Sequence, residues 1–343
     1  MASNNNYPKL HNATWPGVVG KGAPDSEPII PLDTLLKLTA AAEADGQKFD
    51  GVDLWLADPH ISIDSSKDDI KRVSDHIASF GLKVGSFVAP IWGGAGGGSA
   101  MGDSDEVKRF LTQVEKACQI GQWMREIGIR PTGGVRVDSS TGVEAWDKDP
   151  EGNTRKIAAT FREAGRIAEN YGEYIVAEGE ICWGGMHSWR ENVKLLEMVG
   201  MPGVVGYQAD MAHSMLFVLG ANAEKDRILP ADFDWSDKAA LDAAYRKVAD
   251  ALRPWTIDFH VAQNDGTVHG TGSHDKTGRH CPADDPNGKL DIAKCSAIWL
   301  QGAAERGMKH VCWDGCMFPN ATLEKADTWN TILGAMIKVD EAL

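Results

Sequence analysis

The segment YIVAEGEICWGGMHSWRENVKLLEMVGMPGVVGYQAD (174–210) carries the clearest fold signal in this chain. Two short runs within it, 174–181 and 204–210, are rich in β-branched and aromatic residues, which is typical of strands. Between them, the longer amphipathic stretch 189–200 predicts a helix. A strand, a helix and a second strand in this order form one βα unit of a parallel sheet.

The same alternation runs through the whole chain. Connections between parallel strands are almost always right-handed, and eight βα units close into a barrel. We therefore predict an α/β fold, a (β/α)₈ barrel, as one domain spanning 1–343. The expected strands are 10–15, 51–56, 83–92, 133–140, 174–181, 204–210, 256–263 and 309–315, and the expected helices are 32–46, 66–81, 104–128, 153–172, 189–200, 237–253, 291–307 and 322–343.

A doubly wound open sheet is the alternative architecture. It would normally place a glycine-rich phosphate loop after the first strand, with a helix opening directly from that loop. The segment GVVGKG (17–22) follows the first expected strand, but no helix opens directly from it. The barrel is therefore the better interpretation.

Composition and charge exclude several classes of partner. The net charge of −14 disfavours nucleic acid, because an acidic surface repels phosphate backbones. The apolar runs are far shorter than the roughly 20 residues of a membrane span, and 1–15 lacks the pattern of a secretory signal. The six cysteines form no CxxC pair, so we expect reduced thiols in a cytoplasmic protein.

Two long loops are expected on the face where barrel enzymes have their active sites. Residues 92–104 follow the third strand and residues 264–289 follow the seventh, so both lie at the C-terminal face. Long loops without secondary structure are usually functional. The second loop could close over a substrate as a lid or form a subunit contact, and its polar residues include His269, His274, Lys276 and His280.

Acidic and imidazole side chains end the last four expected strands. In a barrel these strand ends converge on one mouth, where unpaired carboxylates would repel one another and raise each other's pKa. A divalent cation relieves that repulsion. A shell of oxygens with one nitrogen suits Mn²⁺, Mg²⁺ or Co²⁺, whereas Zn²⁺ usually has more nitrogen or sulfur ligands. We expect one divalent metal ion, Mn²⁺ first, near Glu178, Glu180, Asp210, His260 and Asp314.

This pattern resembles the xylose isomerase-like superfamily of sugar isomerases and epimerases, over nearly the whole chain and most specifically over 174–320. The D-x-x-H pair of Asp210 and His213 resembles that family's strand-six motif, whose Asp binds metal and whose His meets metal-bound water or substrate. The segments FHVAQNDGTVHG (259–270) and CWDGCMFPNA (312–321) are similar to a subgroup acting on keto sugars and glycosides. That subgroup includes catalytic chains of bacterial C-glycoside-deglycosylating enzymes.

The resemblance implies that a strand-five glutamate, Asp210, His260 and Asp314 bind the metal. Asp314 stands where many relatives have Glu, and strand five offers two glutamates. Glu178 and Glu180 are two residues apart, so on an extended strand they point the same way. We expect Glu180 to be the ligand because it lies nearer the mouth, and Glu178 to support it or to act as an acid or base.

Further polar residues are candidates for catalysis. His187, on the loop after the fifth strand, is a candidate base or substrate ligand, with a histidine at a helix N-terminus as the alternative. His213 is a candidate for contact with substrate or metal-bound water, with core packing as the alternative. Arg136 could bind an anionic group, but pairing with the carboxylates of the mouth is the better interpretation.

Tryptophans at strand ends are candidates for sugar binding. Trp15, Trp92 and Trp183 could stack on the C–H faces of a sugar, although tryptophan is also a common core residue. Asn264 and Asp265 lie in the segment that resembles the keto-sugar subgroup, so we expect them at the substrate as well.

The expected chemistry is proton transfer beside a carbonyl. A metal held by two sugar oxygens polarises the carbonyl and stabilises an enediolate, while a carboxylate or histidine moves the proton. This describes a sugar isomerase or epimerase. The alternative is a lyase or hydratase acting on 3-keto sugars or 3-keto glycosides with the same metal site. The expected binding partner is a small sugar or glycoside. The family resemblance also implies that the protein could form a homo-oligomer.

Two other classes fit less well. A DNA-repair endonuclease on the same barrel would need a histidine-rich zinc cluster and a basic face, and this chain is acidic with one histidine among the four expected ligands. A non-catalytic binding protein would hold its carboxylates in salt bridges and bind no metal.

Overall fold

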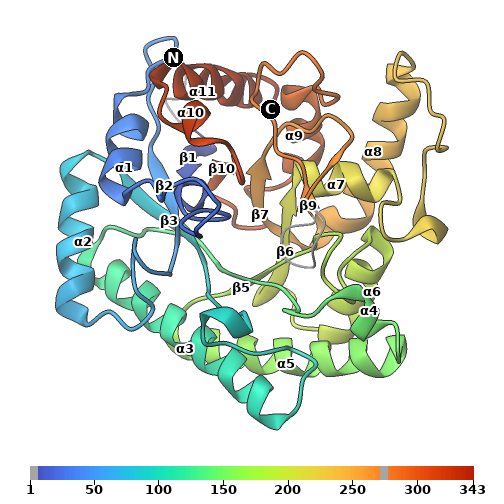
Figure 1. The fold of residues 1–343 in the computed structure, drawn as a ribbon, viewed down its shortest axis with the longest axis horizontal. Coiled ribbons are helices and arrows are strands. Elements are labelled where there is room, and N and C mark those ends of the chain that lie inside the picture. Colours follow the sequence, from blue (N-terminus) through green and yellow to red (C-terminus); the bar gives the residue numbers. More distant parts are fainter. Residues whose placement is uncertain (1–6, 271–276) are drawn as a thin grey trace.

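The closed parallel barrel at the centre of the molecule confirms the predicted fold class. The computed structural model describes residues 7–270 and 277–343, so His274 and Lys276 lie outside the described residues. The barrel strands run in the order β1-β10-β7-β6-β5-β4-β3-β2 and all pairs are parallel (Figure 1). They are β1 (Lys9–Ala13), β2 (Gly51–Trp55), β3 (Lys83–Val88), β4 (Val135–Val137), β5 (Ile175–Glu178), β6 (Val205–Asp210), β7 (Thr256–Val261) and β10 (His310–Trp313).

Helices surround the strands as an outer ring (Figure 1). No described helix is both long and apolar enough to cross a membrane. The long helices are α1 (Leu32–Ala41), α2 (Lys67–Ser79), α3 (Ser104–Ile127), α5 (Pro150–Tyr171), α6 (Trp189–Val199), α8 (Lys238–Leu252), α9 (Ile292–Leu300) and α11 (Ala326–Glu341). Shorter ones are α4 (Val143–Trp146), α7 (Met211–Val218), α10 (Asn320–Leu323) and the 3-10 turns Trp15–Gly17, Gly93–Ala95, Glu224–Asp226 and Arg253–Trp255.

Local chemistry sets the ends of these helices. At the start of α3, the Asp103 carboxylate accepts from two backbone amides while Glu106 caps in return, which satisfies amides that have no partner inside the helix. The same helix ends at Gly128, whose φ of 83° is in the left-handed region that glycine adopts without strain. This helix is therefore observed almost as expected, whereas the helices expected over 32–46 and 291–307 end earlier, at Ala41 and Leu300.

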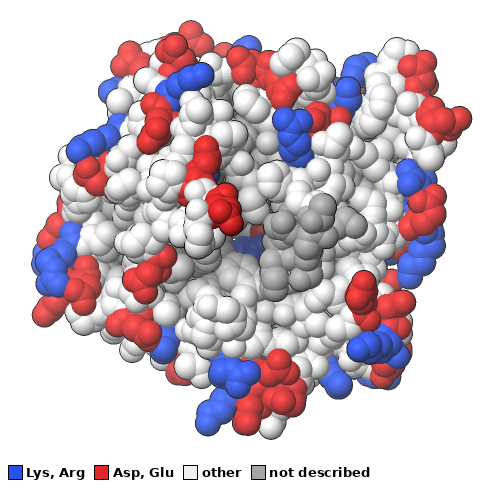
Figure 2. All heavy atoms as spheres, in the orientation of Figure 1, with Lys and Arg blue, Asp and Glu red and all other residues white. Residues whose placement is uncertain are grey.

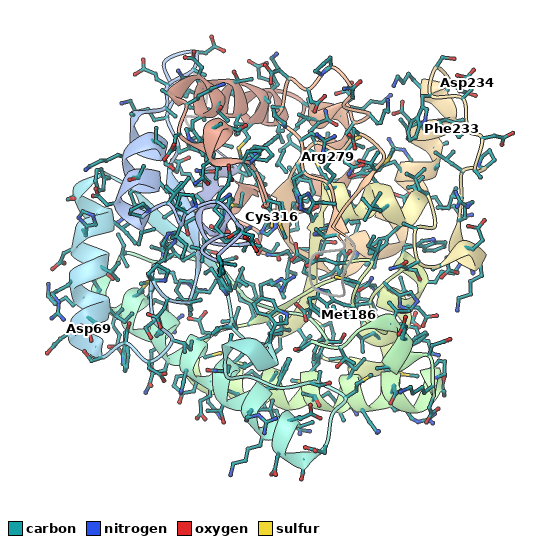
Figure 3. The ribbon with its side chains drawn as sticks, in the orientation of Figure 1. Asp69, Met186, Phe233, Asp234, Arg279 and Cys316 are labelled. Atoms are coloured by element: carbon teal, nitrogen blue, oxygen red, sulfur yellow. The ribbon has the colours of Figure 1, made fainter. Side chains whose placement is uncertain are left out.

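The loops at the C-terminal face carry structure of their own. The loop 264–289 contains the antiparallel pair β8 (Val268–His269) and β9 (Thr277–Gly278), which was not expected from its glycine-rich sequence. Figure 3 places Arg279 of this loop and Cys316, which follows β10, around the barrel mouth. The mouth is therefore walled by loops rather than left open.

The lower part of the barrel is polar inside. The carboxylate of Asp53 lies 2.8 Å from Nδ1 of His11 and 3.2 Å from Nε2 of His310, and all three side chains are buried. The cluster needs the missing side chain of Gly85, because a Cβ there would lie 2.2 Å from Asp53 Oδ1. This network replaces the branched aliphatic layers that commonly fill such barrels.

A buried ion pair braces the N-terminal side of β4. Arg130 is fully buried, and its Nη1 donates to Glu173 Oε2 at 2.6 Å. Its Nε donates to the carbonyl oxygen of Gly85 at 2.8 Å, and its guanidinium lies 4.3 Å from the centre of the Phe87 ring. The charge is thus paired and hydrogen-bonded, as burial requires.

Glu173→Gln should lower the free energy of unfolding by about 3–5 kcal/mol, because it leaves the buried Arg130 guanidinium without its counter-charge. Urea and thermal unfolding followed by circular dichroism measure the loss. The matched control is Glu126→Gln, which removes an acid from a half-exposed pair with Lys67 and should cost less than about 1 kcal/mol. Equal losses in the two variants would contradict the prediction.

Candidate active site

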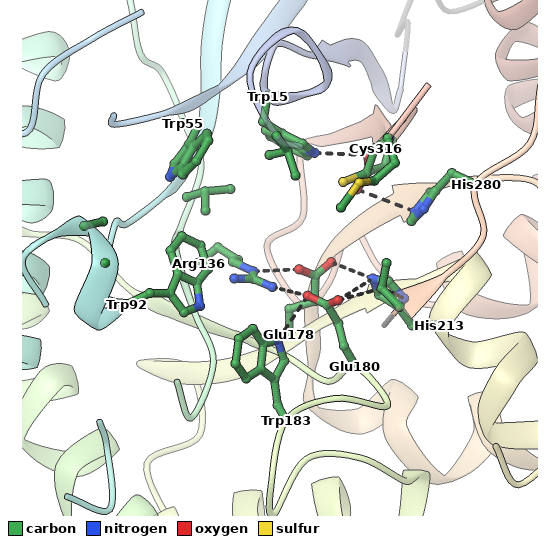
Figure 4. A pocket seen from close by; sticks show the side chains of 17 residues that line it. Trp15, Trp55, Trp92, Arg136, Glu178, Glu180, Trp183, His213, His280 and Cys316 are labelled. Carbon is green, nitrogen blue, oxygen red and sulfur yellow. Dashed lines mark hydrogen bonds and ion pairs between the residues drawn. The ribbon is translucent and has the colours of Figure 1, made fainter. Parts of the chain in front are cut away.

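A cavity of about 410 Å³ opens at the C-terminal ends of the strands. Figure 2 shows a hollow near the middle of this face, with most acidic and basic side chains toward the outer rim. Figure 4 shows indole rings on one side of the cavity and carboxylates with imidazoles on the other. Such a mouth is where barrel enzymes bind their substrates.

Four side chains meet at the base of the cavity. Glu178 ends β5, Asp210 ends β6, His260 lies on β7 and Asp314 follows β10. Their ligand atoms all lie within 4.8 Å of one another. Nδ1 of His260 is 3.3 Å from Glu178 Oε1, 3.8 Å from Asp210 Oδ2 and 3.6 Å from Asp314 Oδ2.

Each carboxylate in this group has one oxygen held by the protein. Glu178 Oε2 accepts from Arg136 Nε at 2.6 Å. Asp210 Oδ1 accepts from the backbone amides of Ala212 at 2.7 Å and His213 at 3.0 Å. These contacts orient the two carboxylates and leave the other oxygen of each facing the centre of the group.

Asp314 follows the same rule. Its Oδ1 accepts from Trp15 Nε1 at 3.0 Å and from the amide of Cys316 at 2.7 Å. Its Oδ2 faces His260 and also lies 3.7 Å from Nε2 of His280, a histidine from the loop 264–289. His280 Nε2 is in addition 3.4 Å from the inward oxygen of Asp210.

The centre of the group fits a divalent cation. Glu178 Oε1 and both ring nitrogens of His260 are buried and have no hydrogen-bond partner among the described residues. Buried polar atoms without partners are costly, and inward-facing carboxylate oxygens repel one another. Three such oxygens and one imidazole nitrogen form a donor set that suits Mn²⁺, Mg²⁺, Co²⁺ or Zn²⁺.

The surroundings keep these groups charged. Burial favours the neutral carboxyl, but Arg136 and His260 outweigh it and hold the pKa of Glu178 well below its usual range. Burial likewise opposes an ionised Asp210, but His213 and His280 bring its pKa to about 2. Burial opposes an imidazolium at His260, yet Asp314 and Glu178 raise its pKa well above the usual value. The carboxylates thus attract positive charge, which a proton on His260 supplies in the metal-free protein and a bound cation would supply in its place.

Glu180 lies beside the group rather than in it. Its Oε1 accepts from Arg136 Nη2 at 2.5 Å and from Trp183 Nε1 at 3.2 Å, and its Oε2 accepts from Thr277 Oγ1 at 2.7 Å. Both glutamates point into the cavity and face Arg136 and His213, but only Glu178 also lies against His260. The geometry therefore favours Glu178 as the ligand, the reverse of the expected assignment.

His213 faces both glutamates across the cavity. Its Nε2 lies 3.7 Å from Glu180 Oε2 and 3.9 Å from Glu178 Oε1. The expected pairing of Arg136 with the mouth is confirmed, because this buried arginine pairs with Asp138, Glu178 and Glu180. Arg136 is thus committed to the protein's own carboxylates.

The three expected tryptophans all line the cavity. Each donates its indole N–H to a carboxylate, which fixes the ring and leaves its apolar faces as cavity wall. The pairs are Trp15 with Asp314 at 3.0 Å, Trp92 with Asp138 at 3.1 Å and Trp183 with Glu180 at 3.2 Å.

Several lining residues were not anticipated. Trp55 ends β2 and lines the cavity, and its position at a strand end was a signal equal to that of the other tryptophans. Thr277 reaches the cavity from the loop 264–289, where no periodic pattern marks individual residues, and His280, expected only as one of that loop's polar residues, lines it too. Cys316 and Met317 follow Asp314 and complete the wall.

Three expected site residues belong neither to the cavity lining nor to the four-residue group at its base. His187 is buried just before α6, and its ring packs edge-on against Trp146 at 4.8 Å, so it matches the helix N-terminal alternative. The Asn264 amide donates to the carbonyl oxygen of Arg279 at 2.7 Å, within its own loop. Asp265 pairs with the Arg279 side chain. Asn264 and Asp265 thus hold the loop together.

A closed parallel barrel with acids and a histidine at the ends of strands five to eight defines a recognisable class of protein. Residues 38–297 match the family described as xylose isomerase-like TIM barrel. The chain belongs to the xylose isomerase-like TIM barrel family. No curated protein sequence matches the chain.

Solved structures of the same fold cover almost the entire chain. A D-tagatose 3-epimerase-like protein is 13% identical, with 97% of this chain and 98% of that one covered and a TM-score of 0.59. The 3-keto-D-glucoside 4-epimerase YcjR from E. coli is 13% identical, with 97% and 99% covered and a TM-score of 0.54. The IOLI protein, solved with a zinc atom, is 13% identical, with 98% and 99% covered and a TM-score of 0.61. At these identities the likeness is one of fold.

Exchanging each glutamate for glutamine should separate the two roles. Glu178→Gln should weaken Mn²⁺ binding by about 100-fold or more, since partners that merely support a metal ligand are already worth about 10–100-fold. Glu180→Gln, the matched control two residues away, should weaken it by at most about tenfold. Calorimetric titration of metal-free protein measures both. A larger loss in Glu180→Gln would restore Glu180 as the ligand.

Proposed function

We propose that this protein is a divalent-metal-dependent sugar isomerase or epimerase that moves a proton next to a carbonyl carbon. The observation that carries the proposal is the arrangement of Glu178, Asp210 and Asp314. Each has one oxygen bound by the protein and the other directed at Nδ1 of His260. The family supports the proposal, as do structural neighbours that are named as sugar epimerases.

The metal would be held at the base of the cavity. When bound there, a divalent cation polarises a sugar carbonyl and stabilises the charge of an enediolate. We propose Mn²⁺ first, with Mg²⁺, Co²⁺ and Zn²⁺ as alternatives. The IOLI neighbour, which holds zinc, supports a divalent cation without selecting one. The proposed ligands are Glu178, Asp210, His260 and Asp314.

Glu180 and His213 are the proposed acid–base residues. Both line the cavity, and Glu180 Oε2 and His213 Nε2 lie 3.7 Å apart just above the proposed metal group. A carboxylate and an imidazole in these places can take a proton from one carbon and return it to that carbon or its neighbour. The surrounding indoles stack on the sugar and keep water out of the reacting end.

A lyase or hydratase acting on 3-keto sugars or 3-keto glycosides is the second proposed function. The cavity of about 410 Å³ falls in the range that binds drug-sized molecules, which leaves room for a group attached to the sugar. A neighbour named for a 3-keto-D-glucoside supports this substrate class as well. The same metal and the same acid–base pair would serve either reaction.

Two further expectations stay proposals. All six cysteines are free thiols, which supports a reducing compartment such as the cytoplasm. The homo-oligomer implied by the resemblance stays a prediction.

Solvent deuterium tests the first function. With Mn²⁺ and a panel of ketohexoses and 3-keto-glucosides in D₂O, one substrate should gain deuterium beside its carbonyl while its carbon skeleton is conserved, as mass spectrometry and NMR detect. Glu180→Gln should slow this exchange by about 10²–10⁴-fold without loss of the metal, the usual worth of an acid–base residue. The control Glu126→Gln, on the outer surface, should not. Metal-loaded protein that exchanges no member of the panel would contradict the proposal.

Elimination leaves a different trace. If the protein is a lyase, a 3-keto-glycoside should lose its leaving group and the product should show the ultraviolet absorbance of an enone. If it is a hydratase, the product should gain the mass of one water molecule. Absorbance and product mass distinguish these results from isomerisation. Isomerised product with no enone and no change of mass excludes the lyase and the hydratase.

A further inference from the structure

The loop 264–289 inserts a hydroxyl group between the two proposed acid–base residues. Thr277 begins β9 and is 4% exposed. Its Oγ1 lies 2.7 Å from Glu180 Oε2 and 3.2 Å from His213 Nδ1. No other described side chain contacts both residues within hydrogen-bonding distance.

The chemistry of the three groups sets the direction of both hydrogen bonds. Glu180 is ion-paired with the Arg136 guanidinium, and a carboxylate in such a pair accepts hydrogen bonds, whereas a threonine hydroxyl has a single hydrogen to donate. The Thr277 hydroxyl therefore donates to Glu180. It can then only accept from His213, so Nδ1 of His213 carries a hydrogen. In the uncharged ring, Nε2 is consequently the atom with the lone pair.

This tautomer matters because Nε2 is the atom directed into the cavity. It lies 3.7 Å from Glu180 Oε2 and 3.9 Å from Glu178 Oε1, beyond the reach of a hydrogen bond to either. The Nε2 lone pair and the two glutamate oxygens therefore form a group of three hydrogen-bond acceptors around one gap. A sugar hydroxyl or the acidic C–H next to a carbonyl is the kind of donor that such a gap takes.

The loop is built to hold Thr277 in place. Gln263 anchors the base of the loop, since its side-chain oxygen accepts from the Leu290 amide at 3.0 Å and its carbonyl oxygen from the Cys281 amide at 2.9 Å. Gly278, beside Thr277, allows close approach to the start of α7, because a Cβ there would lie 3.1 Å from His213 Nδ1. The contact with His213 is therefore a packed feature of the loop.

We propose that Thr277 is a positioning residue that holds His213 in the Nδ1–H tautomer and orients Glu180, so that β9 completes the acid–base pair. The inference rests on the proposed function of Glu180 and His213, but it concerns which residue sets their state. It also gives β9, which carries Thr277, a role in setting the acid–base pair.

Two substitutions separate the hydroxyl from the bulk of the side chain. Thr277→Val keeps the shape and removes both hydrogen bonds, whereas Thr277→Ser keeps the hydroxyl. In protein labelled with ¹⁵N-histidine, long-range ¹⁵N–¹H spectra report the tautomer of His213, assigned by the signals lost in His213→Asn. The wild type and Thr277→Ser should show the Nδ1–H tautomer, and Thr277→Val should lose it.

Exchange of deuterium into the keto-sugar probe should follow the same order. Thr277→Val should be about 10- to 100-fold slower than the wild type, the worth of a hydrogen bond to a charged group, and Thr277→Ser should be within about threefold of it. Mn²⁺ affinity should be unchanged in both. If Thr277→Val fails to fold, Thr277→Ala removes the hydroxyl without adding volume.

An unchanged tautomer in Thr277→Val, or equal losses in Thr277→Val and Thr277→Ser, would overturn the inference, because the hydroxyl would then not be responsible. The two proposals fail separately. If the wild type exchanges no probe at all, the proposed function fails, while the tautomer spectra still decide the role of Thr277.

Discussion

The mouth of the barrel depends on one guanidinium. Arg136 projects from β4 and donates to Asp138, Glu178 and Glu180 through three different nitrogens. A planar group with five donors suits this task, and a lysine ammonium could not hold three carboxylates in fixed orientations. Because Arg136 takes one oxygen of Glu178, the other is free to face His260. The same contact holds Glu180 away from that point, so a single residue sorts two nearby glutamates into two roles.

Polar groups continue below the proposed metal group into the barrel. Asp53, His260 and Cys312 place ligand-type atoms within 4.8 Å of one another, and Asp53 is in turn bonded to His11 and His310. His260 therefore lies between carboxylates above and a carboxylate below. Buried polar networks of this kind are costly unless every member is held, which explains why the barrel interior is so tightly specified. The packing of the outer helices must offset that cost.

The barrel was predictable because strands and helices repeat their signals eight times, and Asp210, His260 and Asp314 followed from it because parallel strands end on one face. The choice between Glu178 and Glu180 as the proposed metal ligand was not predictable from the sequence. Both glutamates do point into the mouth, and what separates them is a contact that spacing does not record: only Glu178 lies against His260. The role of Thr277 was not predictable either. Its contacts depend on the fold of a loop, and a loop has no periodic sequence pattern from which contacts could be read. His187 had the right chemistry, but Trp146 and the start of α6 enclose it.

The division between barrel and loops also explains how relatives of about 13% identity share this fold. In this chain the strand ends bring Glu178, Asp210, His260 and Asp314 to one point through backbone geometry. The walls above it come from less constrained segments: indoles after β1, β2 and β3, and the packed turn that carries Thr277 and His280. Those segments decide what fits over the charged base and how its acid–base residues are set. The proposed metal ligands are thus a property of the barrel, whereas the fit of a substrate and the setting of the proposed acid–base pair are properties of the loops.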